Sequence, residues 1–172
     1  ADRLWGGGGR DRIKGGGGAD RLDGGAGGDM LKGGGGRDRL DGGPGRDVLS
    51  GGPGADRFVF APGDGRDSIW NAAPGSTDDD GHDTLVFDAG IDSADLWFSR
   101  QGNDLVAQIV DGHDQIRLRH WYKDEASRVD HIVAGPGFAF CAGFRRLLLR
   151  IHLLSQRTGR FGQCSRLLLD GF

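Results

Sequence analysis

Residues 6–59 read GGGGRDRIK GGGGADRLD GGAGGDMLK GGGGRDRLD GGPGRDVLS GGPGADRFV, which are six nonapeptides that follow one another without a gap. Every unit has glycine at its first, second and fourth positions, aspartate at its sixth and a large apolar residue at its eighth. Half a unit precedes this run, and a looser copy follows at residues 63–69 after a two-residue insertion. Such self-similarity at a short fixed period is typical of a solenoid, in which each repeat packs on its neighbours.

The two halves of each nonapeptide predict different local structures. Glycine permits positive φ and close backbone approach, so the first six residues are expected to form a tight turn. The last three residues predict a short strand whose eighth-position side chain points inward. Two nonapeptides then complete one coil, and units 18 residues apart stack as parallel strands. We therefore predict an all-β fold with a parallel β-roll over residues 1–70.

The composition indicates that this roll needs more than its core to fold. Glycine accounts for 35 of the 172 residues, and apolar residues make up only 36% of the chain. A chain of this kind buries too little apolar surface to offset the entropy lost on ordering its backbone. Either the segment is a flexible linker, or a bound metal ion supplies the missing free energy. The apolar residue at every eighth position favours the second interpretation.

The sixth-position aspartates are the candidate metal ligands. Stacking every second unit places them in two columns, and a column of carboxylates repels itself unless a divalent cation lies between successive coils. Ca²⁺ takes about six to eight oxygen ligands from carboxylates and backbone carbonyls, whereas Mg²⁺ demands a stricter octahedron. We therefore predict several bound Ca²⁺ ions. The predicted metal ligands are Asp2, Asp11, Asp20, Asp29, Asp38, Asp47, Asp56 and Asp67.

Other interpretations of the acidic and glycine-rich residues are weaker. Asp83 belongs to a degraded copy of the repeat, and Asp78–Asp80 is expected to be a solvated acidic loop with at most weak calcium affinity. A dinucleotide-binding loop is rejected, because its third glycine would coincide with the invariant aspartate, whose charge repels pyrophosphate. No Ser-His-Asp, Cys-His or zinc-protease pattern is present, so we expect no enzyme activity from these residues.

The six tandem nonapeptides resemble the RTX family, the hemolysin-type calcium-binding repeat proteins. The resemblance implies a parallel β-roll with Ca²⁺ held between turns by the aspartates and by loop carbonyls. It also implies export through a type I secretion apparatus, so that the chain stays unfolded in the low-calcium cytosol and folds as a secreted, extracellular protein. Residues 83–137 are similar to the C-terminal domain that commonly follows such repeats.

The segment after the repeats predicts a small β cap domain over residues 71–137. Its expected strands are Thr84–Phe87, residues 104–110, residues 115–121 and residues 128–133, with a hairpin turn between the second and the third. Such a cap would cover the open end of the roll, as solenoid ends require.

The tail, residues 138–172, departs from the family pattern. It holds six arginines, one acidic residue and both cysteines of the chain, and nothing in it resembles a secretion signal. One hypothesis is that this tail is a frameshifted or spliced-on reading. The alternative is an amphipathic helix around Phe144–Leu154.

The charge balance of the remaining chain favours cations as partners. Residues 1–137 carry 16 basic and 24 acidic side chains, a net charge of −8, which disfavours nucleic acid. The chain opens mid-pattern, so we expect a fragment from the C-terminal end of a larger secreted RTX-type protein, such as a toxin, hydrolase or adhesin. Any catalytic domain would lie upstream, and any membrane contact would be made by that larger protein. The alternatives are an adhesive or matrix protein whose roll is the binding surface, or the secretion module of a protease or lipase.

Overall fold

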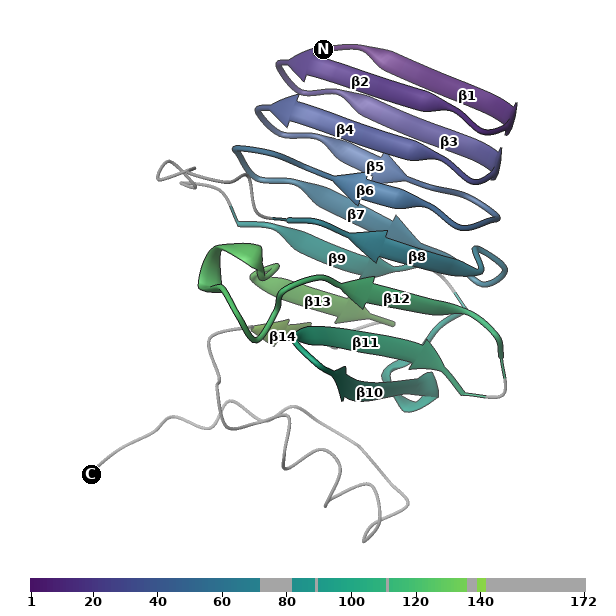
Figure 1. The fold of residues 1–172 in the computed structure, drawn as a ribbon, viewed down its shortest axis with the longest axis vertical. Helices are drawn as coiled ribbons and strands as arrows, with labels where there is room; N and C mark the ends of the chain where they lie inside the picture. The colour runs from purple at the N-terminus through teal and green to yellow at the C-terminus, as the bar shows by residue number, and fades with distance from the viewer. Residues whose placement is uncertain (72–81, 89, 111, 136–138, 142–172) are drawn as a thin grey trace, which may run out of the picture.

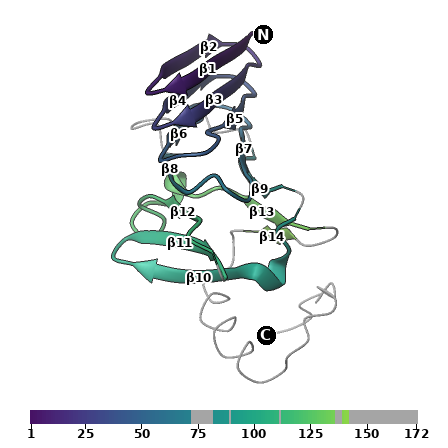
Figure 2. The same ribbon diagram turned by 90° about the vertical axis from the view of Figure 1, so that its right-hand side faces the viewer.

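The computed structural model describes residues 1–71, 82–88, 90–110, 112–135 and, for the backbone alone, 139–141. The predictions for Asp78–Asp80 and for the tail beyond residue 141 fall outside these ranges. The described strands form two seven-stranded sheets that face each other and stack in coils from the N-terminal end downward (Figures 1 and 2). Two short 3₁₀ turns, η1 (Ser93–Asp95) and η2 (Glu125–Ser127), follow later in the chain. The predicted all-β class is confirmed.

The two sheets are made of alternate strands along the repeats. The first sheet contains, in spatial order, β1 (Arg3–Gly9), β3 (Arg21–Gly27), β5 (Arg39–Asp41), β7 (Arg57–Phe60), β9 (Thr84–Phe87), β13 (His131–Ala134) and β14 (Ala139–Cys141). The second contains β10 (Leu96–Gln101), β11 (Asp104–Ile109), β12 (Gln115–Leu118), β8 (Arg66–Ile69), β6 (Val48–Ser50), β4 (Met30–Gly35) and β2 (Arg12–Gly17).

The register between coils is the one that the repeat period predicts. Parallel pairing joins Leu4 to Leu22 and Leu22 to Leu40, each 18 residues further along the chain. The second sheet repeats the pattern, with Ile13 opposite Leu31. Two nonapeptides therefore make one coil, and every unit meets the same position of the unit two ahead.

The turns differ from the prediction in one respect. We expected strands of three residues, but β1 to β4 are six or seven residues long and include the glycines of the turn. Gly7 pairs with Gly25, and Gly16 pairs with Gly34. The reason is that identical turns superpose at strand spacing, so their backbone groups also hydrogen-bond between coils. Gly25 has a φ of +89°, which a glycine adopts without strain.

The core lies between the sheets and is one side chain thick within the repeats. The eighth-position residues of five units are fully buried, and Ile13 and Leu4 at the open end are partly buried. Further down, Phe60 and Phe87 meet edge to face with ring centroids 5.8 Å apart. The fully buried eighth-position residues are Leu22, Leu31, Leu40, Leu49 and Phe58.

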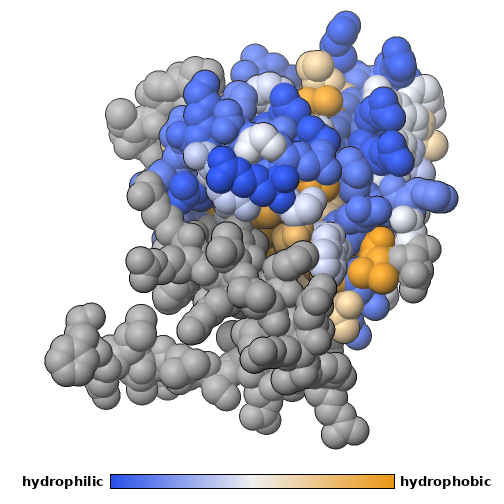
Figure 3. All heavy atoms as spheres, turned by 60° about the horizontal axis from the view of Figure 1, so that its bottom comes forward, coloured by the Kyte–Doolittle hydropathy of each residue, from blue (hydrophilic) through white to orange (hydrophobic). Residues whose placement is uncertain are grey.

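The strands after the repeats extend both sheets across the predicted boundary at residue 70. β9 pairs in parallel with β7, and β12 pairs in parallel with β8. β11 and β12 are antiparallel, as expected for the predicted hairpin, and β10 adds an antiparallel strand that the sequence did not predict. No helix among the described residues is long and apolar enough to cross a bilayer. Seen from this lower end, most of the coloured surface is hydrophilic (Figure 3).

Candidate metal centre

The sixth-position aspartates stand at the start of the strands, in two columns that run along the coils. Column A precedes or opens the strands of the first sheet, and column B those of the second. The residues of column A within the repeats are Asp2, Asp20, Asp38 and Asp56, and those of column B are Asp11, Asp29, Asp47 and Asp67. The structure therefore brings together all eight residues that the sequence predicted, in the two groups that the period implied.

From the second coil on, one oxygen of each column carboxylate holds successive coils together. The backbone N–H of Asp11 donates to Oδ1 of Asp29 at 2.8 Å, and that of Asp29 donates to Oδ1 of Asp47 at 2.7 Å. Column A repeats this contact, with Asp20 donating to Oδ1 of Asp38 at 2.8 Å. The bond uses one carboxylate oxygen and leaves the other, Oδ2, for a different partner.

The second oxygen is buried without a hydrogen bond in most of these residues. Burial of an unpaired carboxylate oxygen is costly, so its repetition along a column calls for a partner that the protein itself does not supply. Asp29 and Asp47 are only 2% and 1% exposed. The residues whose Oδ2 is buried and accepts no hydrogen bond include Asp11, Asp20, Asp29, Asp38, Asp47 and Asp67.

The first glycine of each unit lies beside this oxygen, which leaves no room for a side chain at that position. A methyl carbon on Gly24 would lie 2.7 Å from Oδ2 of Asp29 and 2.6 Å from the carbonyl oxygen of Gly42, one coil further. At Gly15 the same point lies 2.6 Å from Oδ2 of Asp20. A side chain at this glycine would therefore clash with one carboxylate oxygen and one carbonyl oxygen that lie side by side, and such a pair of oxygens is a donor set that suits a hard cation.

The ligand chemistry favours calcium over softer metals. Within the described residues, no three side chains of histidine, cysteine, aspartate or glutamate converge on one point. An ion in a column would therefore take one or two carboxylates and fill its remaining positions with backbone carbonyls and water. Ca²⁺ accepts such a set, whereas Zn²⁺ sites are usually tetrahedral and built largely from cysteine sulfur and histidine nitrogen.

A comparison with protein-family models identifies the repeats. The model of the RTX calcium-binding nonapeptide repeat, which spans four copies, matches residues 1–31, 24–58 and 32–69. The chain carries RTX calcium-binding repeats. The parallel β-roll, its aspartate columns and the expected Ca²⁺ ligand class agree with this assignment, which covers the chain up to residue 69. That each of the eight aspartates binds an ion stays a prediction.

Column A continues past the RTX repeats through Asp83, which the sequence assigned to a degraded copy of the repeat, to Asp130, which the sequence did not lead us to predict. The backbone N–H of Asp56 donates to Oδ1 of Asp83 at 2.7 Å, and that of Asp83 donates to Oδ2 of Asp130 at 2.9 Å. The signal was present in the sequence, since Asp83-Thr-Leu-Val and Asp130-His-Ile-Val keep the aspartate and the apolar residue two positions later. The degraded spacing around Asp83 and the absence of repeat glycines before Asp130 obscure it.

The partner of Asp83 sets this turn apart from those of the repeats. The side-chain amide of Asn71 donates to Oδ2 of Asp83 at 2.6 Å and to the carbonyl oxygen of Arg128 at 2.8 Å. Asn71 is 4% exposed. An amide N–H₂ group therefore bridges a carboxylate oxygen and a carbonyl oxygen, the two kinds of oxygen that adjoin the first glycines of the repeats. At Asp83 the Oδ2 atom thus accepts a hydrogen bond from the protein itself.

Column B ends at Asp67. The residue opposite Asp67 on β12 is Ile116, which is fully buried and offers no oxygen from its side chain. Asp64, three residues earlier, is 5% exposed, and its Oδ2 accepts from the backbone N–H of Ala61 at 2.6 Å. The last aspartate of column B therefore lies opposite an apolar residue, whereas column A continues with Asp83 and Asp130 next to the later strands.

Burial favours the protonated form of several column carboxyl groups when no cation compensates their negative charge. Burial, together with the charge of Asp29 in the same column, raises the pKa of Asp47 to about 6. Burial, with the charges of Asp47, Asp64 and Asp114, raises the pKa of Asp67 to about 8. Burial also raises the pKa of Asp38. The ionised columns are therefore unfavourable in the metal-free fold, and a divalent cation would reverse that preference.

These pKa values predict that the metal-free roll is more stable in acid. A carboxyl group whose pKa is raised on folding binds more protons in the folded state than in the unfolded state. For Asp67, its contribution to stability is therefore complete below pH 3.8, falls as the pH rises and is lost above a pH of about 8. Each extra bound proton changes the free energy of unfolding by about 1.4 kcal/mol per pH unit. In a chelator, far-UV circular dichroism should show more β-structure at pH 5 than at pH 8. Equal spectra at both pH values would contradict the prediction, and Asp67→Asn should weaken the dependence.

Crowding one of these oxygen pairs should disrupt one ion site. We expect Gly24→Ala to weaken calcium binding beside Asp29, because the methyl group would displace Oδ2 of Asp29 and the carbonyl oxygen of Gly42 and would also cost about 1–3 kcal/mol through overpacking. Gly35→Ala is the matched control, since a methyl carbon there has no neighbour within 4 Å. Isothermal titration calorimetry checks both variants. If Gly24→Ala bound as many Ca²⁺ ions as the unchanged chain, no ion would be held beside Gly24 and Asp29.

Proposed function

We propose that this chain is a calcium-dependent folding module of a larger secreted RTX-type protein, such as a toxin, hydrolase or adhesin. The observation that carries the proposal is the row of buried Oδ2 atoms that accept no hydrogen bond, repeated from coil to coil in both columns. Ca²⁺ between the coils would bind these oxygens together with carbonyls such as that of Gly42. The ions would supply the free energy that a glycine-rich chain with a thin core lacks.

The proposed cellular role follows from where calcium is available. A chain that folds only with millimolar Ca²⁺ stays extended in the cytosol, which suits export through a type I apparatus, and folds once outside. Residues 1–135 would then act by folding and by capping. Any catalysis by the larger protein would be carried out by residues outside this chain, as in the alternative that it is the secretion module of a protease or lipase.

The calcium concentration at which the chain folds tests this role. We expect protection against limited proteolysis to appear at about 10⁻⁴–10⁻³ M Ca²⁺, the range of extracellular calcium modules. Such a midpoint would keep the chain unfolded at cytosolic calcium levels. A midpoint near or below about 10⁻⁷ M, typical of intracellular sites, would mean that the chain folds before export and would contradict the proposal.

A further inference from the structure

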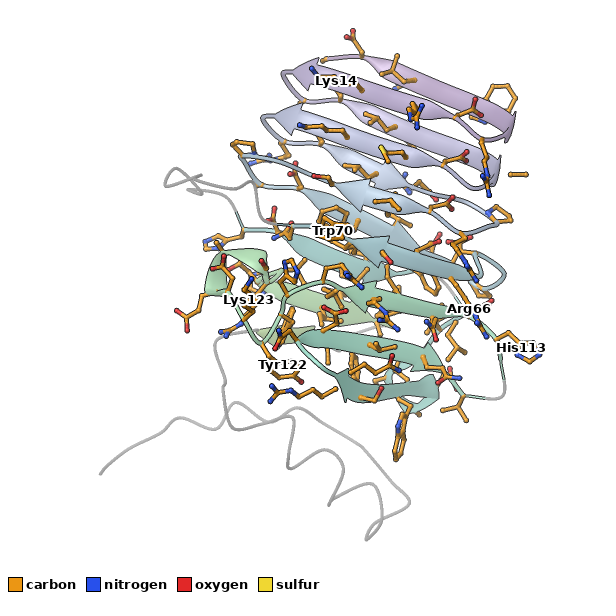
Figure 4. All side chains as sticks on the ribbon, in the orientation of Figure 1. Lys14, Arg66, Trp70, His113, Tyr122 and Lys123 are labelled. Carbon is orange, nitrogen blue, oxygen red and sulfur yellow. The ribbon has the colours of Figure 1, made fainter. Side chains whose placement is uncertain are left out.

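An open groove of about 720 Å³ lies at the edge of the second sheet, where β2, β4 and β6 begin. Figure 4 labels Arg66 at this edge, at the start of β8, and Lys14 further along β2. The groove crosses three successive coils, and its lining includes none of the first glycines of the units. Its charged lining consists of three arginines, Arg10, Arg12 and Arg46, and two residues of column B, Asp11 and Asp29.

Gly28 opens the groove between two arginines. Arg10, Gly28 and Arg46 are the fifth residues of units on successive coils, so the backbones of the two arginines lie roughly 10 Å apart, twice the strand spacing. A methyl carbon on Gly28 would lie 3.6 Å from Nε of Arg10 and 3.5 Å from the carbonyl oxygen of Arg46. The missing side chain therefore leaves room beside the side chain of Arg10 and the backbone of Arg46, within a groove that both arginines line.

The arginines of the groove form no ion pairs within the described residues. In the part of the chain that the structure describes, no carboxylate lies within ion-pair distance of Arg10, Arg12 or Arg46. The two aspartates are directed elsewhere, since the Oδ2 atoms of Asp11 and Asp29 are buried in column B. The groove thus presents guanidinium groups to solvent while its acidic groups face the interior.

The surface beside the groove is basic and partly apolar. The outward residues of β2 and β4 are Arg12, Lys14, Met30 and Lys32, and Met30 is 48% exposed. Val48 continues this strip on β6 and lines the groove with Met30. The first sheet differs, because β3 and β5 carry Asp23 and Asp41 among their outward residues.

We propose that this groove binds an anionic polysaccharide, whose carboxylate or sulfate groups pair with Arg10, Arg12 and Arg46. Guanidinium groups bind such anions through paired, charge-assisted hydrogen bonds. Met30 and Val48 offer an apolar floor to the C–H faces of sugar rings. Arg10 and Arg46 line the groove two coils apart, so that separate anionic groups along a linear polymer can pair with them, and the groove is open at the surface, so that a chain can lie across it.

Calcium should strengthen this binding, and this step rests on the proposed calcium sites. Residues 1–70 contain 11 lysines and arginines and 11 aspartates, so their formal charge is zero without metal. Each bound Ca²⁺ adds two positive charges, and those in column B would lie directly behind the groove. The loaded roll becomes cationic and attracts a polyanion, in a manner that salt screens.

Binding of defined polymers to the calcium-loaded chain tests the proposal. The probes are hyaluronan and dextran sulfate, with uncharged dextran as the control polymer, measured by calorimetry in saturating calcium. We expect the double variant Arg10→Gln/Arg46→Gln to bind roughly 100-fold more weakly, about tenfold for each arginine that no longer pairs with an anionic group. The matched control is Arg3→Gln/Arg57→Gln, which removes the same charge from the first sheet and should bind as the unchanged chain does.

Parallel measurements separate this proposal from the calcium proposal. Calcium stoichiometry is determined for every variant, so a chain that fails to load calcium is distinguished from one that loads calcium but binds no polymer. Gly28→Glu, which places a carboxylate between Arg10 and Arg46, should abolish binding, whereas Gly28→Ala should retain it. Equal loss in both double variants, or no binding of either anionic polymer by the loaded chain, would overturn the proposal. Binding to anionic lipid vesicles in preference to both polymers would overturn the choice of a polysaccharide.

Discussion

Titrating Ca²⁺ into the metal-free chain is expected to produce a cooperative coil-to-β transition in far-UV circular dichroism. The physical reason is that the repeats bury only one large apolar side chain per unit while their glycines lose more backbone entropy than other residues. At neutral pH the buried Oδ2 atoms of residues such as Asp29 and Asp47 add an unfavourable term that a cation removes. Metal binding and folding should therefore occur as one event.

Mg²⁺ is the matched control for this transition. It carries the same charge, but it dehydrates reluctantly and demands a near-ideal octahedron, so the mixed carboxylate and carbonyl set of each coil suits it poorly. We expect no transition in Mg²⁺ at the concentrations at which Ca²⁺ acts. A transition of equal midpoint in both ions would show that general charge screening folds the roll. A β-rich spectrum in chelator at neutral pH would show that the core suffices without metal.

The register of the roll could be predicted from the sequence because the repeat is strict. With an aspartate and an apolar residue at fixed places in each nonapeptide, only a coil of two units aligns Leu22 with Leu40 and Asp20 with Asp38. The two aspartate columns follow from the same count. The full depth of burial at Asp47, and hence its raised pKa, depends on the coils above and below and could not be read from one unit.

The end of column A could not be predicted, because the nine-residue period that places the other column aspartates is interrupted after residue 59. Asn71 contacts Asp83 and the carbonyl oxygen of Arg128, which are 12 and 57 residues away. No periodic spacing connects these three residues, and only the three-dimensional arrangement of β8, β9 and β13 brings them together. The sequence retained the local pattern at Asp83 and Asp130, yet nothing in it indicated that an amide side chain would take up the Oδ2 of Asp83.

The groove illustrates a different limit of sequence reasoning. Each fifth-position arginine, taken alone, indicates a solvated charge that offsets the acidic columns. The groove combines Arg10, Gly28 and Arg46 on stacked coils, while the Oδ2 atoms of the two acids beside them are buried. The sequence contains all five residues, but it does not show that they line one groove. That becomes clear only when units 18 residues apart are stacked in the structure.

Replacing one column aspartate should remove calcium from the turns on both sides of it. Asp29→Asn keeps the side-chain oxygen that accepts from the backbone N–H of Asp11, so the contact between coils survives. It replaces the buried Oδ2 with an N–H₂ group, which repels a cation and offers it no lone pair. We expect calorimetry to show fewer bound Ca²⁺ ions and the folding transition to shift to higher calcium concentration.

Asp83→Asn is the matched variant in the same kind of column position. Its Oδ2 already accepts from Asn71 at 2.6 Å, so no cation is needed there, and the calcium stoichiometry should equal that of the unchanged chain. Stability should still fall by about 1–3 kcal/mol, because two amide N–H₂ groups would then face each other in a buried place. If both variants lost the same number of ions, Asn71 would not replace a cation. If Asp29→Asn lost none, the column carboxylates would not be the ligands, and the ions would be held by the turn carbonyls alone.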